Sequence, residues 1–278
     1  MLSPVNPSLP IGVFDSGVGG LTVLRALRRQ LPAESMIYLG DTARLPYGTK
    51  SAESVVRYAT QAAEHLVKRG IKLLVVACNT ASAVSLDPLR ERFGALPVVG
   101  VVEPGAAAAV AARPRHRRHL VLATESTVKR HAYARAIHAL APDDVVDEVA
   151  CSVLVALAEE GWTEGPVAEA AARAYLQPAM SASTDGVLGT IVLGCTHFPP
   201  LEGTIRAVAG AGPIIVDSAT TTAAHVATLL DQRGMRTMAA GPGTVTLIAT
   251  DGADRFARVG SRFLGEPIQA AGVEIVDL

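Results

Sequence analysis

Short runs of apolar, mostly β-branched residues alternate along the chain with longer segments whose apolar positions recur at helical spacing. Such runs are typical of strands buried on both faces of a parallel sheet. They predict strands at residues 11–14, 35–39, 75–78, 97–104, 119–123, 145–149, 191–195, 216–218 and 244–250. The segments between them predict helices at residues 21–31, 51–69, 105–112, 128–140, 154–160, 166–180, 219–233 and 254–263, and one ending near residue 93. This alternation predicts an α/β fold.

The strand–helix pattern occurs twice and therefore predicts two similar domains. We place the crossing between them near Glu103-Pro104 and the return near Asp217-Ser218. The first domain would then contain residues 1–103 and 218–278, and the second would contain residues 104–217. Each is expected to hold a mostly parallel sheet flanked by helices, with the active site in the cleft between the two domains.

Two of the polar connections have both a structural and a functional interpretation. Residues 15–20 form a glycine-rich turn between a strand and a helix, which is typical of an anion site but also of a simple tight turn. Residues 40–48 form either a surface turn or a loop that offers the Tyr47 hydroxyl and backbone N–H groups to a pocket. The remaining connections are predicted to be a loose leader at residues 1–10, a basic loop at 113–119 and a polar turn at 124–127.

Two of the buried runs end on a cysteine, at Cys78 and at Cys195. Ligands of α/β proteins bind at the carboxyl ends of parallel strands, so we expect the two thiols to face each other across one pocket. A helix N-terminus lowers the pKa of a thiol, and both cysteines are predicted to lie at one. His197 follows Cys195 closely, and Asp15 at the tip of the first strand is expected near Cys78.

Composition narrows the class of protein. Of the 278 residues, 49% are hydrophobic, so a sizeable core can be buried. The net charge is -1 and aromatic residues make up 4%, which gives no reason to expect nucleic acid or a membrane surface as a partner. The chain has three cysteines, no apparent signal peptide and no apolar run of transmembrane length, so we predict a cytoplasmic protein with free thiols.

Two thiols in similar settings favour acid–base chemistry on both faces of one carbon atom. One thiol would remove the α-proton of an amino acid and the other would return a proton, which inverts the centre. Backbone N–H groups around Asn79, Thr80 and Thr196 would stabilise the carbanionic transition state. One cysteine with one histidine would instead suggest a thiol hydrolase.

Neither a metal nor an organic cofactor is expected. The chain has no metal-binding motif, and no lysine lies at a strand end where it could hold pyridoxal phosphate. Cys151 is interpreted as a core residue, because cysteine is among the most buried residue types.

The motifs as an ordered set resemble one family. They are IGVFDSGVGG at residues 11–20, YLGDTARLPYG at 38–48, ACNTAS at 77–82, GVVEP at 100–104 and GCTHFP at 194–199. In that order they resemble the bacterial glutamate racemases of the cofactor-independent aspartate/glutamate racemase superfamily. Where that family usually has a Gly-Thr pair, this chain has Ala123-Thr124.

The resemblance implies an isomerase that interconverts L- and D-glutamate without a cofactor and supplies D-glutamate for peptidoglycan. It implies Cys78 and Cys195 as the two bases, with Asp15 and His197 as their supporting acid–base groups. A further carboxylate would be Glu159, although Glu160 follows it directly. The residues implied to bind substrate are Asp15, Ser16, Pro46, Tyr47, Gly48, Asn79, Thr80, Thr127, Thr196 and His197.

Two other interpretations stay open. A racemase of aspartate or another small acid in the same superfamily would use the same motifs. A DNA gyrase-inhibiting role could accompany racemisation, with residues 113–118 or the leader as the contact. The resemblance also implies a homodimer.

Overall fold

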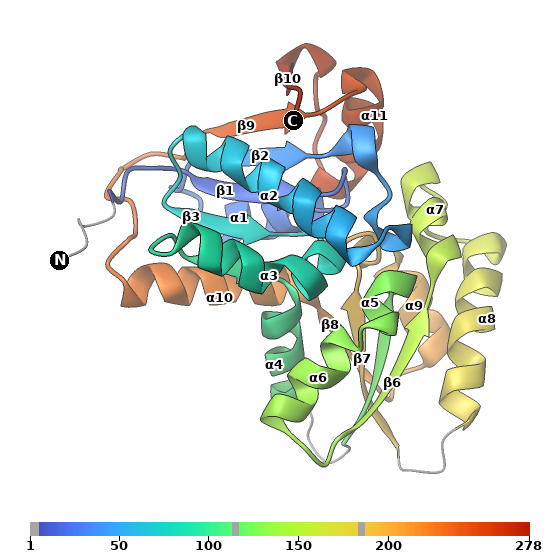
Figure 1. The fold of residues 1–278 in the computed structure, drawn as a ribbon. Helices are drawn as coiled ribbons and strands as arrows, with labels where there is room; N and C mark the ends of the chain where they lie inside the picture. Colours follow the sequence, from blue (N-terminus) through green and yellow to red (C-terminus); the bar gives the residue numbers. More distant parts are fainter. Residues whose placement is uncertain (1–5, 113–116, 183–186) are drawn as a thin grey trace.

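The computed structural model describes residues 6–112, 117–182 and 187–278, and it has two lobes that are each built on a parallel sheet (Figure 1). The first sheet has six strands in the order β10-β9-β2-β1-β3-β4, and all of its pairings are parallel. Its strands are β1 (Ile11–Asp15), β2 (Met36–Gly40), β3 (Leu73–Val76), β4 (Val98–Gly100), β9 (Val245–Ala249) and β10 (Val273–Ile275).

Helices cover both faces of the six-stranded sheet. Helices α2 and α3 pack together on one face, whereas α1 packs against α10 and α11 on the other. The helices are α1 (Leu21–Gln30), α2 (Ala52–Lys68), α3 (Asn79–Phe93), α10 (Ser218–Gln232) and α11 (Ala253–Leu264), with short 3₁₀ turns η1 (Thr42–Arg44), η2 (Tyr47–Thr49) and η4 (Ala270–Gly272).

The second lobe holds a four-stranded parallel sheet in the order β6-β5-β7-β8. Its strands are β5 (Arg118–Ala123), β6 (Val145–Ala150), β7 (Leu188–Gly194) and β8 (Ile214–Asp217). Its helices are α4 (Val102–Ala112), α5 (Glu125–Lys129), α6 (Ala132–Leu140), α7 (Ser152–Glu160), α8 (Pro166–Ala182) and α9 (Glu202–Ala209), with the 3₁₀ turn η3 (Pro199–Leu201).

The central strands of both sheets are buried along their whole length, as the apolar runs predict. One hydrophobic cluster continues from the first lobe into the second and includes Val13, Val75, Leu122 and Leu193. The fold class predicted from the sequence is thus confirmed, with one sheet larger than the other. The boundaries predicted near Glu103 and Asp217 stay a prediction.

Three local predictions were wrong. The strand predicted at 97–104 ends at Gly100, and α4 begins at Val102. Pro104 lies in the first turn of this helix. Proline is tolerated there because backbone N–H groups in the first turn make no hydrogen bonds within the helix. The polar turn predicted at 124–127 is largely helical, because α5 covers Glu125–Lys129. The helix predicted at 128–140 is interrupted at His131, whose φ of 49° is left-handed.

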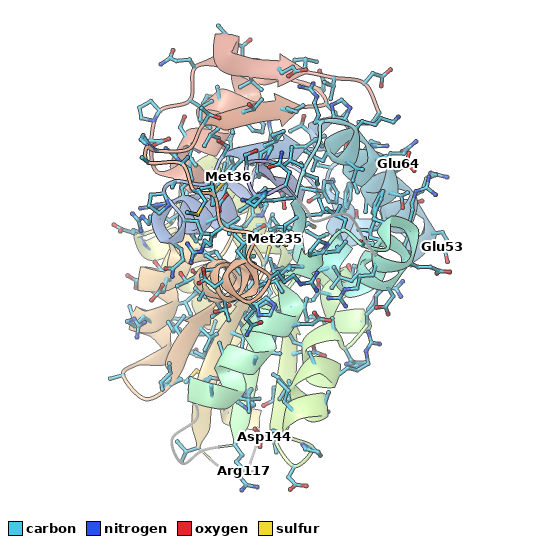
Figure 2. All side chains as sticks on the ribbon, turned by 90° about the vertical axis from the view of Figure 1, so that its left-hand side faces the viewer. Met36, Glu53, Glu64, Arg117, Asp144 and Met235 are labelled. Atoms are coloured by element: carbon cyan, nitrogen blue, oxygen red, sulfur yellow. The ribbon has the colours of Figure 1, made fainter. Side chains whose placement is uncertain are left out.

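The predicted basic loop was wrong in its last two residues. Arg118 and His119 are buried in β5, where Arg118 pairs with Asp147 at 2.7 Å and His119 contacts Thr190 at 2.6 Å. Arg117 lies at the lower end of the second lobe, near Asp144 (Figure 2). Residues 113–116 of that loop and 1–5 of the leader lie outside the described part of the chain.

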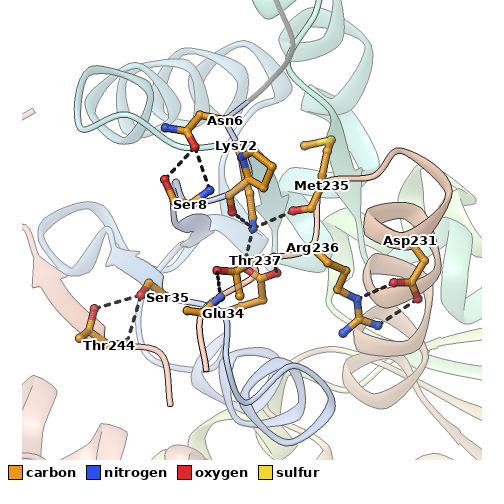
Figure 3. Close-up of polar contacts among 12 residues, drawn as sticks. Asn6, Ser8, Glu34, Ser35, Lys72, Asp231, Met235, Arg236, Thr237 and Thr244 are labelled. Atoms are coloured by element: carbon orange, nitrogen blue, oxygen red, sulfur yellow. Dashed lines mark hydrogen bonds and ion pairs between the residues drawn. The ribbon is translucent and has the colours of Figure 1, made fainter. Parts of the chain in front are cut away.

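A buried lysine ties three segments together at the end of the first sheet where β3 begins (Figure 3). Lys72 pairs with Glu34 and donates to the backbone oxygens of Pro7, at 2.6 Å, and Met235, at 2.9 Å. Glu34 also accepts from the Thr237 amide at 2.8 Å. This lysine therefore lies at the opposite end of the strand from Cys78.

In the described residues, no helix has the length and apolar character needed to cross a membrane.

Candidate active site

The carboxyl ends of β1 and β3 in the first lobe meet those of β5 and β7 in the second. Three hydrogen bonds join the two sides there. The Thr80 and Thr124 hydroxyls are 2.9 Å apart, the Tyr133 hydroxyl donates to Asn79 Oδ1 at 2.7 Å, and the Thr22 hydroxyl donates to the Thr196 carbonyl at 3.1 Å. These contacts bring the two cysteine-bearing strand ends to one place.

Cys78 is buried and caps the N-terminus of α3, where its sulfur accepts from the Ala81 amide at 3.4 Å. The predicted lowering of its pKa was wrong. Burial, reinforced by the negative charge of Asp15, raises the pKa of the Cys78 thiol to about 12, although hydrogen bonds from Ser16 and Ala81 act in the opposite direction. In the structure, Cys78 therefore favours the form that donates a proton.

Cys195 follows β7 and is also buried, but it does not lie at a helix N-terminus as predicted. A turn through Thr196 and His197 comes next, then η3, and α9 begins only at Glu202. The neighbour that can stabilise negative charge on Cys195 is instead His197, whose Nδ1 is 3.8 Å from the sulfur. The two thiols are close enough to interact electrostatically.

His197 links Cys195 to a carboxylate of the same lobe. Its Nε2 is 3.1 Å from Glu159 Oε1. Burial opposes a charge on His197, but the hydrogen bonds with Cys195 and Glu159 outweigh it and raise the His197 pKa to about 10. The same bond, helped by Arg255, lowers the pKa of Glu159 to about 2 against the effect of burial. The pair is thus an imidazolium and a carboxylate at neutral pH.

Glu159 is the carboxylate that reaches the site, whereas Glu160 is exposed. We expect Glu159→Gln to lower kcat about 10-fold, because it removes the charge that holds the proton on His197. Glu160→Gln should leave kcat unchanged, and initial racemisation rates of the two purified variants measure the difference. Equal losses in both variants would contradict the assignment.

The backbone N–H groups of the glycine-rich turn are directed at a side chain of the turn itself, the carboxylate of Asp15. The backbone N–H groups of Ser16, Gly17 and Gly20 act on the carboxylate of Asp15, with Gly17 N at 2.9 Å from Oδ2. Burial nevertheless raises the pKa of Asp15. The turn therefore positions Asp15, whose charge interacts with both Cys78 and His197.

Gly19 leaves room for His197. A Cβ at this position would lie 2.4 Å from His197 Nδ1 and 2.5 Å from Thr196 Oγ1. We expect Gly19→Ala to lower kcat about 100-fold, since the imidazole must move away from Cys195. At Gly17 the nearest atom to such a Cβ is 3.5 Å away, so Gly17→Ala is the matched control and should keep its activity. Rates and melting temperatures of both variants distinguish a displaced imidazole from a damaged fold.

Two buried polar atoms beside the thiols have no hydrogen-bond partner in the structure, Asp15 Oδ1 and Asn79 Nδ2. An unsatisfied buried polar group costs about 1–3 kcal/mol, and a ligand is one explanation for such a group in a native fold. One atom is an acceptor and the other a donor. Together they suit an ammonium group and a carboxylate group.

The loop predicted to offer Tyr47 does so only in part. The Tyr47 side chain is buried, its hydroxyl donates to Asp41, and burial with the charge of Asp41 raises its pKa. Pro46 is exposed at the start of η2, and a Cβ on Gly48 would lie 3.2 Å from Thr124. The Tyr47 hydroxyl is thus engaged by Asp41, and the contribution this loop can make to a ligand comes from its other groups.

A polar cleft of about 350 Å³ opens between η2 and α5. It is lined by Gly48, Thr49, Lys50, Glu125, Ser126, Lys129 and Arg130. The three cations outnumber the single carboxylate, which favours the approach of an anionic molecule.

In the described parts of the chain, no group of three or more His, Cys, Asp or Glu side chains is placed to hold a metal ion.

Comparison with known proteins supplies the family. Residues 11–226 match the family model described as Asp/Glu/Hydantoin racemase. The chain belongs to this family. It is 49% identical to the glutamate racemase of Geobacter metallireducens over 93% of this chain and 94% of that protein.

Solved structures agree with this membership of the racemase family. Thermus thermophilus glutamate racemase, in complex with β-chloro-D-alanine, has a TM-score of 0.87 and 43% identity, with 98% of each chain covered. Francisella tularensis glutamate racemase, in complex with D-glutamate, also has a TM-score of 0.87, with 34% identity and 98% of each chain covered.

Two residues that the structure places at this site, Thr124 and Tyr133, were not identified from the sequence. Thr124 joins Thr80 to Thr127, whose hydroxyl is 3.0 Å away, and Tyr133 orients Asn79. Thr124 follows a buried strand just as Asn79 follows β3, so its position was a usable signal. Nothing in the local pattern of Tyr133 indicates a polar partner across the lobes.

Cys151 is the third buried thiol and fits its interpretation as a core residue. Its sulfur donates to the Val149 carbonyl at 3.4 Å, and burial raises its pKa to about 12. It packs in the hydrophobic cluster that also contains Leu154 and Cys195. These surroundings are those of an inert thiol.

Proposed function

We propose that this chain interconverts L- and D-glutamate without a cofactor and supplies D-glutamate for peptidoglycan. The observation that carries the proposal is the pair of buried thiols at facing strand ends, with unpartnered Asp15 Oδ1 and Asn79 Nδ2 between the same elements. Relatives named glutamate racemase at 49% and 43% identity support glutamate as the substrate.

The two thiols would carry different starting roles. Cys195, beside the imidazolium of His197, would remove the α-proton of one enantiomer, and Cys78 would deliver a proton to the opposite face. For the other enantiomer the roles reverse. Asp15 would support Cys78, and Glu159 would support His197.

Substrate would be held by groups from both lobes. Asp15 Oδ1 is suited to the ammonium group and Asn79 Nδ2 to a carboxylate. Helix α3 begins at Asn79, so its first N–H groups add a donor set for an anion. The further contacts we propose are Ser16, Thr80, Thr127, Thr196 and the backbone at Pro46, Tyr47 and Gly48.

We further propose that the chain works in the cytoplasm as a homodimer. Contact with DNA gyrase, through the loop at residues 113–118 or through the leader, would be an additional role.

Circular dichroism of the purified protein with L-glutamate, and separately with L-aspartate, tests the proposed substrate. No cofactor is added, and the protein is first dialysed against a chelator. The proposal expects the glutamate signal to decay to zero and the aspartate signal to persist. Decay with aspartate alone would assign the chain to a sister racemase, and no decay with either would overturn racemisation of these acids.

A further inference from the structure

Helix α11 packs on the first lobe (Figure 1), and two of its arginines contact the end of α7 in the second lobe. Arg255 Nη2 lies 2.8 Å from Glu159 Oε2, and Arg262 Nη1 donates to the Glu159 carbonyl. The ring of Phe263 meets the His197 imidazole edge-on, with 5.0 Å between centroids. Residues 253–264 lie beyond the part of the chain that matches the family model.

We propose that Arg255 is a positioning residue, which holds one carboxylate oxygen of Glu159 so that the other oxygen stays directed at His197. The proposal rests on the proposed racemase function. It concerns a residue that touches neither thiol and acts through Glu159 alone.

The geometry at the end of α7 explains why Glu159 needs such a partner. Glu159 is the penultimate residue of α7, whose last carbonyls have no intrahelical donors, and Gly161 then turns the chain at a φ of 78°. Arg262 supplies a donor to the Glu159 carbonyl. Arg255 fixes the side chain, and Oε1 is left for His197 Nε2. Arg262 thus binds the backbone of Glu159, and Arg255, on the same helix, binds its side chain.

The effect of Arg255 should be on catalysis more than on folding. Its side chain is 47% exposed, and an exposed ion pair contributes little to the stability of the fold. Rotation of the Glu159 carboxylate, in contrast, would weaken the bond that keeps the proton on His197.

The charged and titratable groups that face His197 come from four elements. They are Cys195 beside it, Asp15 at the end of β1 and Glu159 on α7, with Arg255 and Arg262 on α11 in contact with Glu159. Arg255 itself would oppose a second positive charge, but its main contact is with Glu159, whose bond to His197 favours that charge. Loss of Arg255 should therefore lower the His197 pKa.

The test compares Arg255→Ala, Arg255→Lys and Arg258→Ala in the full chain. Arg258 is an exposed arginine one turn further along α11 and serves as the matched control. We expect Arg255→Ala to lower kcat about 5-fold with KM within about 2-fold, to move the alkaline limb of the pH profile to lower pH, and to be partly rescued by lysine. Arg258→Ala should match wild type.

An isotope measurement separates positioning from general damage. With α-deuterated substrate, Arg255→Ala should raise the kinetic isotope effect for the enantiomer whose proton Cys195 removes and lower it for the other, because only the Cys195 step has slowed. Equal changes for both enantiomers, or an Arg255→Ala profile like that of Arg258→Ala, would overturn the proposal. If wild type itself fails to racemise glutamate, the proposed function fails instead.

Discussion

Cys78→Ala and Cys195→Ala should each lower racemisation of glutamate by at least about 1,000-fold. Each variant removes one of the two groups that can carry a proton to or from the α-carbon, and general acid–base catalysis typically contributes about 10²–10⁴-fold. The remaining thiol should not replace the missing one, since the proposed mechanism places the two thiols on opposite faces of the substrate. Decay of the circular dichroism signal from L-glutamate and from D-glutamate measures the loss.

Cys151→Ala is the matched control for both variants. Its thiol is equally buried and belongs to the same hydrophobic cluster as Cys195, but it packs in the core behind the site. We expect Cys151→Ala to keep its rate within about 3-fold and to lose about 1 kcal/mol of stability at most. A Cys78 or Cys195 variant that retained racemisation, or a Cys151 variant that lost it, would contradict the assignment of the two bases.

His197→Asn should lower kcat about 100-fold at neutral pH and remove the alkaline limb of the rate profile. The wild-type His197 pKa is about 10, so its positive charge is present at neutral pH and is lost as the pH rises through that value. The wild-type rate should therefore fall as the pH approaches and passes 10. Asparagine cannot titrate, so this limb should disappear.

The raised pKa of His197 also makes the stability of the fold depend on pH. The folded-state pKa of His197 lies above its ordinary value of 6.5, so its contribution is complete below about pH 6.5 and is lost as the pH rises toward 10. Glu159 acts in the other direction, with a contribution that is complete above 4.5 and lost as the pH falls toward 2.

An exposed histidine provides the control for these profiles. His225→Asn on α10 should leave the rate, the alkaline limb and the melting temperature close to wild type. Rates measured between pH 7 and 10.5 compare the three proteins. A wild-type limb that persists unchanged in His197→Asn would assign it to another group and contradict the role of His197.

The parallel strands and the placement of the chemistry on them were predictable from the sequence. The apolar runs that end at Cys78 and Cys195 are typical of strands buried on both faces of a parallel sheet, and the carboxyl ends of such strands then carry the thiols. The interruption at His131 was not predictable, because nothing in the apolar spacing around it marks a left-handed residue.

The properties of the thiols depend on long-range packing. A helix N-terminus suggested a lowered pKa for Cys78, but burial of the thiol and the negative charge of Asp15, from another strand of the sheet, raise that pKa. Likewise, the partner of Glu159 on α11 lies 96 residues away and no local spacing indicates it. The sequence therefore identifies the reacting groups better than their protonation states.

The most direct test of two-base racemisation is the reaction of L-glutamate in D₂O, followed early by mass spectrometry after separation of the enantiomers. If Cys195 and Cys78 act on opposite faces, the D-glutamate formed carries deuterium from the solvent at Cα, and the L-glutamate that remains keeps its protium. D-glutamate that retains the substrate's own α-hydrogen would show a single group carrying the proton across, and would contradict the account.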